Sequence, residues 1–397
     1  MKILQICFRV PYPPTDGGAI AMFGITQGLA NAGHEVTVLA INTPKHFQSD
    51  TVLEGIAEKL FTVYVDTKIT VLKAFLNLFK TVPYIVERFI SKEFEETLIH
   101  LLKKDSFDIV HFEGTYVAWY AAIVKRTVNV PVLMRSHNVE YLIWERLSQS
   151  VKNPLKKLYF KYMAWELKRF EKKYLNKFDL VAAITPEDAE RIKQLGVKTK
   201  VQFLPASIDT DKIKPSVNIE AEAKTCFIFS ALDWMPNQEA VFWFIERVWD
   251  KVVKKIPGVK LHIAGKSTPE KIYALANESI VVHGFVESAS VFVQQYDLML
   301  VPLLSGGGMR LKIIEGMALG KVVLSTPVGA EGIGCRDGEN ILICETPEKW
   351  VSTIIDFFVN REKYKEIGKK GRILVESKYS EEVIMSKLIK MYQEITA

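Results

Sequence analysis

Residues 298–318 read LMLVPLLSGGGMRLKIIEGMA, and this stretch decides which fold the chain can adopt. An apolar run is followed by Gly306, Gly307 and Gly308, and a helical pattern begins close to Arg310. A strand that enters a helix through a glycine-rich turn leaves backbone N–H groups and the positive end of the helix dipole facing that turn. The stretch therefore predicts a parallel α/β fold with an anion site at a strand end.

Two cations stand directly after the glycines. Arg310 and Lys312 place full positive charges beside the turn, which suits a diphosphate. Glu315, one position beyond the following two isoleucines, is placed to accept hydrogen bonds from a sugar hydroxyl. A βα turn with a solvated Arg and Lys would have the same sequence, so the rest of the chain has to decide between these interpretations.

Strand-like and helix-like stretches alternate along all 397 residues, which is typical of parallel α/β architecture. The first half has expected strands at Lys2–Phe8, Glu35–Ile41, Phe61–Val65, Asp108–Phe112, Val130–Arg135, Leu180–Ile184 and Val201–Leu204. The second half has them at Cys226–Leu232, Lys260–Ala264, Ile280–Val282, Leu298–Leu304 and Val322–Ser325. Several are continuous apolar runs, so helices are expected on both faces of each sheet.

A polar segment with a proline, Lys212–Ser216, is interpreted as the linker between two domains. We therefore expect Rossmann-like domains at residues 1–212 and 213–379, and a C-terminal helix at 380–397 that packs back on the N-terminal domain. Ligands of such sheets bind at the carboxyl ends of the strands, here in a cleft between the domains. Asn237 is expected to cap a helix, and Thr346 with Pro347 to begin another.

The composition is ordinary for a globular protein, with 48% hydrophobic and 25% charged residues and a net charge of +6. The sequence contains no apolar run of the ~18–20 residues that a membrane span requires. The apolar start is followed by Pro11, Pro13 and Pro14, which favours a buried strand over a signal peptide. The four cysteines lack metal-site spacing, so we expect buried thiols and a cytoplasmic protein.

Taken together, five segments make the chain similar to a known family. They are FRVPYPPTDGGAIAMFGITQGLANAGHEVTVLA, RSHNVEYLIWERL, SALDWMPNQEAVFWF, HGFV and LLSGGGMRLKIIEGMALGKVVLSTPVGAEGI. In this order and spacing the chain resembles retaining glycosyltransferases of the family-four type with the GT-B fold, in the bacterial cell-surface polysaccharide branch. The resemblance implies two doubly wound Rossmann-like domains facing a central cleft, with the acceptor on the first domain and a nucleotide-sugar donor on the second. It also implies that the anomeric configuration is retained and that no metal or other cofactor is needed.

In the N-terminal domain the resemblance singles out three residues. Gly17 and Gly18 match the glycine pair after the first strand, a loop that approaches the donor phosphates and the acceptor. Adjacent glycines allow close approach of the backbone and leave N–H groups free at the helix start, although a plain tight turn would also use them. His137 matches the histidine that hydrogen-bonds the sugar near the reacting centre, and is the expected catalytic residue. The alternative is a structural histidine.

In the C-terminal domain Glu315 matches the second glutamate of a Glu-x7-Glu motif, which contacts the nucleotide ribose. Gly307 replaces the first glutamate, so backbone amides of Gly306–Gly308 are expected to bind the donor sugar. The usual cationic phosphate clamp is also replaced, by the segment that contains Asp233. We therefore expect Arg310 and Lys312 to bind the diphosphate. The weaker donor-site candidates are Lys266, Asp233 and the backbone of Gly284, which matches a loop that reads the base.

The sequence Asp209-Thr210-Asp211 has the Asp-x-Asp pattern of metal-dependent glycosyltransferases. It lies close to the expected linker and away from the glycine-rich strand end. We interpret it as a capped turn and expect no metal site.

Two basic segments raise the question of a membrane partner. Nine Lys or Arg residues lie in Lys152–Lys177, against only Glu166 and Glu171, and Val71–Lys80 places Lys73, Asn77 and Lys80 on one helical stripe. Basic amphipathic helices with aromatic residues suit an anionic bilayer, which would make the protein peripheral on the cytoplasmic face of the inner membrane. A core-packed helix with a solvated basic face is the alternative. Nucleic acid is not expected, because no RNP, zinc or helix-turn-helix motif accompanies the charge.

The sequence thus predicts a hexosyltransferase-type enzyme that moves a sugar from a nucleotide-diphosphate sugar to a glycan or lipid-linked acceptor in surface polysaccharide synthesis. The first alternative is another enzyme of the same fold, a nucleotide-sugar epimerase or a phosphorylase. The phosphorylase would need a Schiff-base lysine, and no lysine stands in a recognisable context for one. The second is a non-catalytic nucleotide-sugar-binding protein, suggested by Gly307 in place of the glutamate.

Overall fold

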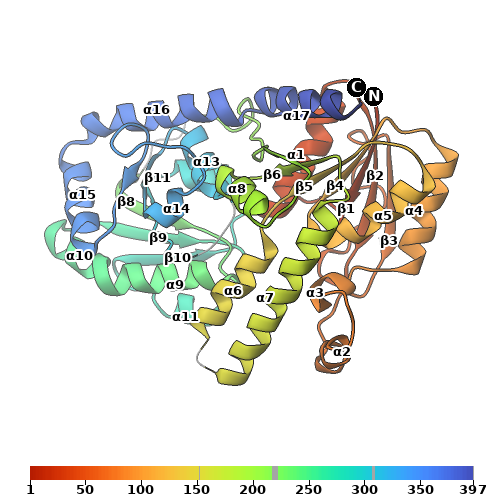
Figure 1. The fold of residues 1–397 in the computed structure, drawn as a ribbon. Coiled ribbons are helices and arrows are strands. Elements are labelled where there is room, and N and C mark those ends of the chain that lie inside the picture. The colour runs from red at the N-terminus through yellow and green to blue at the C-terminus, as the bar shows by residue number, and fades with distance from the viewer. Residues whose placement is uncertain (152, 217–221, 306–308, 397) are drawn as a thin grey trace. The chain divides into compact units, whose positions relative to one another are not determined.

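The computed structural model describes residues 1–151, 153–216, 222–305 and 309–396. The chain divides into two compact units, one made of Met1–Ser207 with Ile384–Ala397 and the other of Ile208–Val383. Each has its own parallel sheet (Figure 1). The glycines Gly306–Gly308 lie outside the described residues, so their predicted role stays a prediction.

The first unit is a doubly wound sheet with the strand order β3-β2-β1-β4-β5-β6-β7. Its strands are β1 (Lys2–Cys7), β2 (Glu35–Asn42), β3 (Lys59–Tyr64), β4 (Ile109–Glu113), β5 (Val132–Ser136), β6 (Leu180–Ala183) and β7 (Lys200–Phe203). Its helices are α1 (Gly17–Asn31), α2 (Val71–Asn77), α3 (Tyr84–Glu87), α4 (Lys92–Lys104), α5 (Ala121–Thr127), α6 (Glu140–Ser150), α7 (Pro154–Leu175) and α8 (Pro186–Gln194), with short 3₁₀ turns η1 (Pro44–His46) and η2 (Thr115–Tyr120). The order reverses between β1 and β4, which is where such sheets bind ligands.

Helices cover both faces of this sheet, as its continuous apolar strands require. Apolar side chains of α4, α5, α7 and α8 pack on one face. On the other face α1 packs beside α17 (Glu381–Thr396), whose Met385, Leu388 and Tyr392 join the core. Gly28 on α1 permits this contact, because a Cβ there would lie 2.6 Å from the sulfur of Met385.

The second unit has the strand order β10-β9-β8-β11-β12-β13. Its strands are β8 (Glu222–Phe229), β9 (Lys260–Ala264), β10 (Ile280–Gly284), β11 (Tyr296–Val301), β12 (Val322–Ser325) and β13 (Leu342–Ile343). Its helices are α9 (Met235–Phe244), which continues through a π-helical turn η3 (Ile245–Trp249) into α10 (Asp250–Lys255), then α11 (Glu270–Tyr273), α12 (Ala289–Gln294), α13 (Leu311–Ala318), α14 (Pro327–Ala330), α15 (Pro347–Val359) and α16 (Arg361–Tyr379). The switch point here lies between β8 and β11.

Some predicted boundaries were wrong, each for a local reason. β11 stops at Val301 instead of Leu304, because Pro302 has no N–H to continue a ladder. α9 begins at Met235, so Asn237 lies inside its first turn and does not cap it. The prediction for α15 was confirmed: the Thr346 side chain caps the helix and Pro347 opens it.

The predicted helical stripe at Val71–Lys80 was also wrong. α2 ends at Asn77, and that side chain is buried rather than exposed beside Lys73 and Lys80. α7 is a long helix as expected, but Glu166 and Glu171 on it are buried.

Candidate functional site

Lys312 lies at the carboxyl ends of β8 and β11, at the switch point of the second sheet. Its Nζ donates to Ser230 Oγ at 2.7 Å and to Asn237 Oδ1 at 2.9 Å. Within the described part of the chain no carboxylate lies within ion-pair distance of this ammonium group. Burial, with the charge of Arg310 as a second cause, lowers the pKa of Lys312 to about 7. A lysine held this way gains by meeting an anion, which would restore its ordinary pKa.

Arg310 stands at the N-cap position of α13 and is buried. One of its Nη atoms donates to the carbonyl oxygen of Val328 at 3.3 Å. The side chain is therefore fixed in the wall of the same strand-end region. Two like charges held together in a buried place are costly, and a bound diphosphate would offset that cost.

Glu315 lies one turn further along α13 and is half-buried. Burial raises its pKa to about 7. Within the described residues no hydrogen-bond donor contacts its carboxylate. A carboxylate so placed lacks the partner that would stabilise its charge, and the hydroxyls of a ribose would supply one.

The weaker donor candidates lie on loops of the second unit. Asp233 and Lys266 are both exposed, and the Lys266 carbonyl accepts from Leu232 N at 3.0 Å, which joins the loops after β8 and β9. Gly284 ends β10 with φ of +71°, and a Cβ there would lie 2.0 Å from the hydroxyl of Tyr273. Its backbone conformation thus already requires glycine, whatever it binds.

In the first unit His137 follows the last residue of β5. Its Nε2 lies 2.6 Å from Oε2 of Glu113, the last residue of β4. The parallel register pairs Cys7 with Glu113 and Glu113 with Arg135, so the ends of β1, β4 and β5 meet at one edge. Burial lowers the pKa of His137, against the opposing effect of the Glu113 carboxylate. The imidazole is therefore neutral near pH 7.

Glu113 is fully buried and held by a network. Its Oε1 accepts from Gln5 Nε2 at 3.2 Å and lies 3.2 Å from Nε2 of His111, and its Oε2 lies 3.6 Å from Nη1 of Arg135. Burial alone would raise the pKa of Glu113, but Arg135 and His111 hold it well below the usual range. The charged carboxylate is a fixed acceptor for the histidine.

One part of the prediction for the glycine pair was wrong, namely that its N–H groups are free, whereas its role in binding stays a prediction. Asp16 caps α1, and its Oδ1 accepts from the N–H groups of Gly18 and Ala19 at 3.1 and 3.2 Å, so the N–H of Gly18 is not free. Arg9 pairs with the same carboxylate and, against the effect of burial, lowers its pKa to about 2. A Cβ at Gly18 would lie 3.0 Å from Arg9, so glycine here makes room for that ion pair, and Gly17 is exposed beside it.

The Asp-x-Asp segment is a capped turn, as predicted. Oδ1 of Asp209 accepts from the N–H groups of Asp211 and Lys212 at 3.2 and 3.0 Å, and Oδ2 pairs with Nζ of Lys212 at 2.8 Å. Across the described ranges no three His, Cys, Asp or Glu side chains are grouped to hold a metal ion.

Sequence reasoning missed three parts of these sites: Glu113, the Arg9–Asp16 pair and Ser230. A signal existed for Glu113, since a carboxylate directly after a buried strand lies at the edge where such sheets bind ligands. No sequence signal existed for Ser230, because its role depends on the reach of a lysine 82 positions away.

Family models match both halves of the chain. Residues 15–212 match the model described as Glycosyltransferase Family 4, and residues 223–360 match the one described as Glycosyl transferases group 1. Together the two matches span most of the sequence.

Two curated relatives are similar in sequence. An uncharacterized 44.6 kDa protein in the cps region of Klebsiella pneumoniae is 24% identical over 402 residues, which cover 98% of this chain and 99% of that protein. An uncharacterized glycosyltransferase of Methanocaldococcus jannaschii is 24% identical over 236 residues, covering 56% of this chain and 54% of that one.

Solved structures share the architecture. Sucrose-phosphate synthase from Thermosynechococcus elongatus has a TM-score of 0.74 at 17% identity and covers 99% of this chain and 98% of its own. Anabaena Alr3699/HepE in complex with UDP-glucose has a TM-score of 0.68 at 14% identity, with coverage of 99% and 100%. At these identities the likeness establishes the fold, which is GT-B. Among the helices of the described residues, none is both long and apolar enough to cross a bilayer.

Proposed function

Since the chain belongs to the family-4 type of glycosyltransferase with the GT-B fold, we propose that it uses a nucleotide-diphosphate sugar and a glycan or lipid-linked acceptor. The reaction is retaining, needs no metal and transfers a hexosyl group. Two solved neighbours support the donor class, because Anabaena Alr3699/HepE was crystallised with UDP or UDP-glucose and the pneumococcal O-GlcNAc transferase GtfA with UDP and GlcNAc. The relative from a cps region supports a place in surface polysaccharide synthesis.

One observation carries the donor assignment: two cations at the switch point of the second sheet, Arg310 and Lys312, with the lysine held without a carboxylate partner in the described structure. A sulfate or carboxylate would meet the charge, but a diphosphate offers enough oxygens for both cations at once. Glu315 on the same helix then accepts from the nucleotide ribose.

The proposed chemistry breaks the bond between the anomeric carbon and the diphosphate oxygen and forms a bond from that carbon to the acceptor oxygen. The proton of the acceptor hydroxyl passes to the leaving diphosphate on the same face of the sugar. Arg310 and Lys312 stabilise the charge that grows on the diphosphate, and they are already in position before the reaction. His137, held by Glu113, orients the reacting sugar.

We also propose that the protein works as a peripheral protein at the cytoplasmic face of an anionic membrane, where a lipid-linked acceptor would present its sugar. The excess of Lys and Arg on α7 supports this assignment.

Calorimetry with UDP, GDP and the corresponding nucleotide sugars tests the donor site. Lys312→Met should weaken diphosphate binding by about 1.5–3 kcal/mol, the range for hydrogen bonds to charged groups. Lys321→Met is the matched control, because Lys321 is also a half-buried lysine with a lowered pKa. Its Nζ is held by the carbonyls of Gln294 and Tyr296 at the other end of β11. Equal affinities for wild type and Lys312→Met would overturn the donor site.

Product analysis separates the remaining functions. NMR of the product with an excess of acceptor should show the anomeric configuration of the donor. Turnover of nucleotide sugar without any acceptor into a second nucleotide sugar would favour an epimerase. Tight binding without transfer or donor hydrolysis would favour a non-catalytic binding protein.

A further inference from the structure

The segment 69–79 of the first unit, here called the apolar tip, turns its apolar side chains outward. Ile69, Val71, Leu72, Phe75, Leu76 and Phe79 are each more than half exposed, up to 88% for Val71. Figure 1 shows α2, at the centre of this tip, on a loop that extends beyond α3. Exposed apolar patches of this kind are rare on soluble surfaces and mark an interaction site.

The tip is inverted relative to an ordinary surface helix, because its polar residue faces inward. Asn77 is buried, and its Nδ2 donates to the carbonyl of Val82 at 2.8 Å and to Glu87. The N–H of Thr70 donates to the hydroxyl of Tyr84 at 3.0 Å. These polar contacts attach the tip to α3 and hold its apolar face away from the core.

The charges within the segment 68–82 are of one sign, and one of its lysines, Lys80, is paired with Glu87 of α3. The sequence from 68 to 82, KITVLKAFLNLFKTV, contains Lys68, Lys73 and Lys80 and no acidic residue. In the same unit, the first turns of α7 also expose Leu155 and Leu158, and Lys156 and Lys157 stand between them in the sequence. Apolar side chains with a rim of lysines match a bilayer of anionic lipids, whose headgroups attract the lysines while the acyl region takes the apolar groups.

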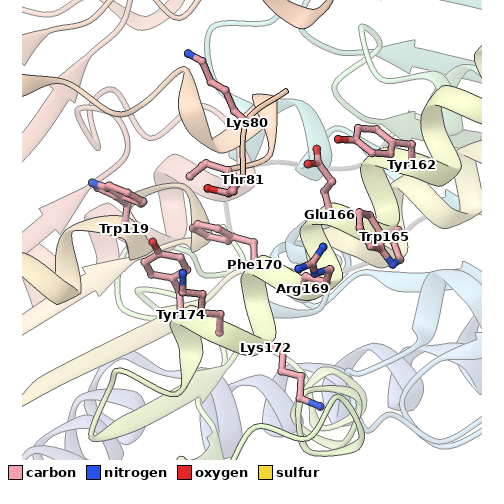
Figure 2. A pocket seen from close by; sticks show the side chains of 12 residues that line it. Lys80, Thr81, Trp119, Tyr162, Trp165, Glu166, Arg169, Phe170, Lys172 and Tyr174 are labelled. Carbon is pink, nitrogen blue, oxygen red and sulfur yellow. The ribbon is translucent and has the colours of Figure 1, made fainter. Parts of the chain in front are cut away.

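A cavity of about 740 Å³ opens directly after the tip, between residues 80–82, Trp119 and α7. Figure 2 shows Trp119, Phe170 and Tyr174 grouped on one side and Trp165 and Arg169 on the other. The guanidinium of Arg169 lies over the Trp165 ring, with its Cζ atom 4.6 Å from the ring centroid. Four cations line the cavity (Lys80, Arg169, Lys172 and Lys173) against one lining carboxylate, Glu166. Lys80 is already paired with Glu87, so Arg169, Lys172 and Lys173 are the cations that favour an anionic group there.

We propose that the apolar tip enters one leaflet of an anionic bilayer and that this cavity binds the phosphate headgroup of one of its lipids. The inference rests on the membrane association proposed above and identifies the side chains that would contact the bilayer. It does not depend on glycosyl transfer, because both features belong to the first unit and need no substrate.

Co-sedimentation tests the tip with vesicles of phosphatidylcholine alone and of phosphatidylcholine with 30% phosphatidylglycerol, at low and high salt. Leu72→Ser/Phe79→Ser should lower the partition coefficient on anionic vesicles at least tenfold, because two apolar groups no longer leave water. Val359→Ser/Ile373→Ser is the matched control, since both side chains are exposed on the second unit, and it should change nothing.

The cavity is tested separately. Arg169→Ala/Lys173→Ala should lower binding to the phosphatidylglycerol vesicles by roughly 5- to 25-fold, since each cation near an anionic surface contributes about fivefold. Binding to neutral vesicles should stay as in wild type. Lys103→Ala/Lys104→Ala, in the last turn of α4, removes two cations elsewhere in the first unit and should keep most of the binding.

Two results would overturn the proposal. One is the same partition for wild type and the tip variant on all vesicles. The other is a wild-type dimer that the tip variant converts to monomer while vesicle binding is absent in both, which would make the tip a contact between copies. Transfer to a water-soluble acceptor, measured in parallel, reports on the enzymatic function alone.

Discussion

The carboxylate of Glu113 lies 2.6 Å from Nε2 of His137, and this contact fixes which ring nitrogen remains available. The pKa of Glu113 is held below its usual range, so the carboxylate is charged and can only accept a hydrogen bond. Nε2 therefore carries the proton. Because the pKa of His137 is lowered, mainly by burial, Nδ1 is an unprotonated acceptor near pH 7. His137 is thus suited to accept from a sugar hydroxyl rather than to donate a proton.

Glu113→Gln should lower the rate of transfer by roughly 10- to 100-fold while donor affinity stays unchanged, because an amide can no longer fix the tautomer of His137. His137→Ala should have an effect at least as large. Both variants would be measured for kcat with saturating donor and for donor affinity by calorimetry.

Tyr392→Phe is the control for this network. It removes the hydroxyl that lies 2.6 Å from Nδ1 of His111, and His111 is connected to His137 through Glu113. It should cost about 1 kcal/mol of stability and leave the rate intact. Wild-type turnover in a folded His137→Ala variant would make the histidine structural.

Diphosphate binding should take up a proton at Lys312. In the free protein burial lowers its pKa to about 7, and a bound diphosphate should raise it toward its ordinary value. At pH 8 most free protein molecules have an uncharged Lys312, so diphosphate binding should take up nearly one proton per protein. At pH 6 the lysine is already charged, and proton uptake is small. Calorimetry of UDP binding in Tris and in HEPES measures this, since the apparent enthalpies should differ at pH 8. Equal enthalpies in both buffers, or a difference that survives in Lys312→Met, would contradict the assignment.

Glu315→Gln should weaken nucleotide binding about 10- to 100-fold and yet stabilise the fold at pH 8. The pKa of about 7 in the folded state lies above the ordinary glutamate value of 4.5, so the folded state binds the proton more tightly. The free energy of unfolding therefore keeps its full value below about pH 4.5 and decreases as the pH rises toward 7, by up to ~3 kcal/mol. Glutamine removes this loss. Thermal melts at pH 4.5 and 8, with and without UDP, would test both effects, and a large drop in melting temperature with intact affinity would make Glu315 structural.

Transfer should continue in EDTA. The backbone and Lys212 already occupy the oxygens of Asp209, so the Asp-x-Asp segment is committed to its turn. Asp211→Asn should change the rate less than twofold. Activity that disappears with EDTA and returns with manganese would revive Asp209 and Asp211 as ligands.

The sequence was sufficient for the alternation of strands and helices, and Lys260–Ala264 and Val322–Ser325 were predicted with the bounds that the structure has. Buried parallel strands are continuous apolar runs, and a helix start such as Thr346-Pro347 depends on a capping residue and the proline after it. Both can be recognised because the residues involved are adjacent in the sequence. The same holds for Arg310 and Lys312, which stand next to a glycine-rich strand end.

Tertiary structure alone decided which side chains meet. Glu113 reaches His137 because parallel pairing aligns the ends of β4 and β5, and Lys312 reaches Ser230 because β11 lies beside β8. Tertiary structure also decided which way the apolar tip faces. The sequence predicted Asn77 on an exposed stripe with two lysines, whereas in the structure Asn77 is buried and the apolar side chains point outward. Local sequence sets backbone preference and hydrophobic period, whereas burial, charge partners and pKa shifts depend on groups that are distant in the chain and become neighbours only when the sheets form.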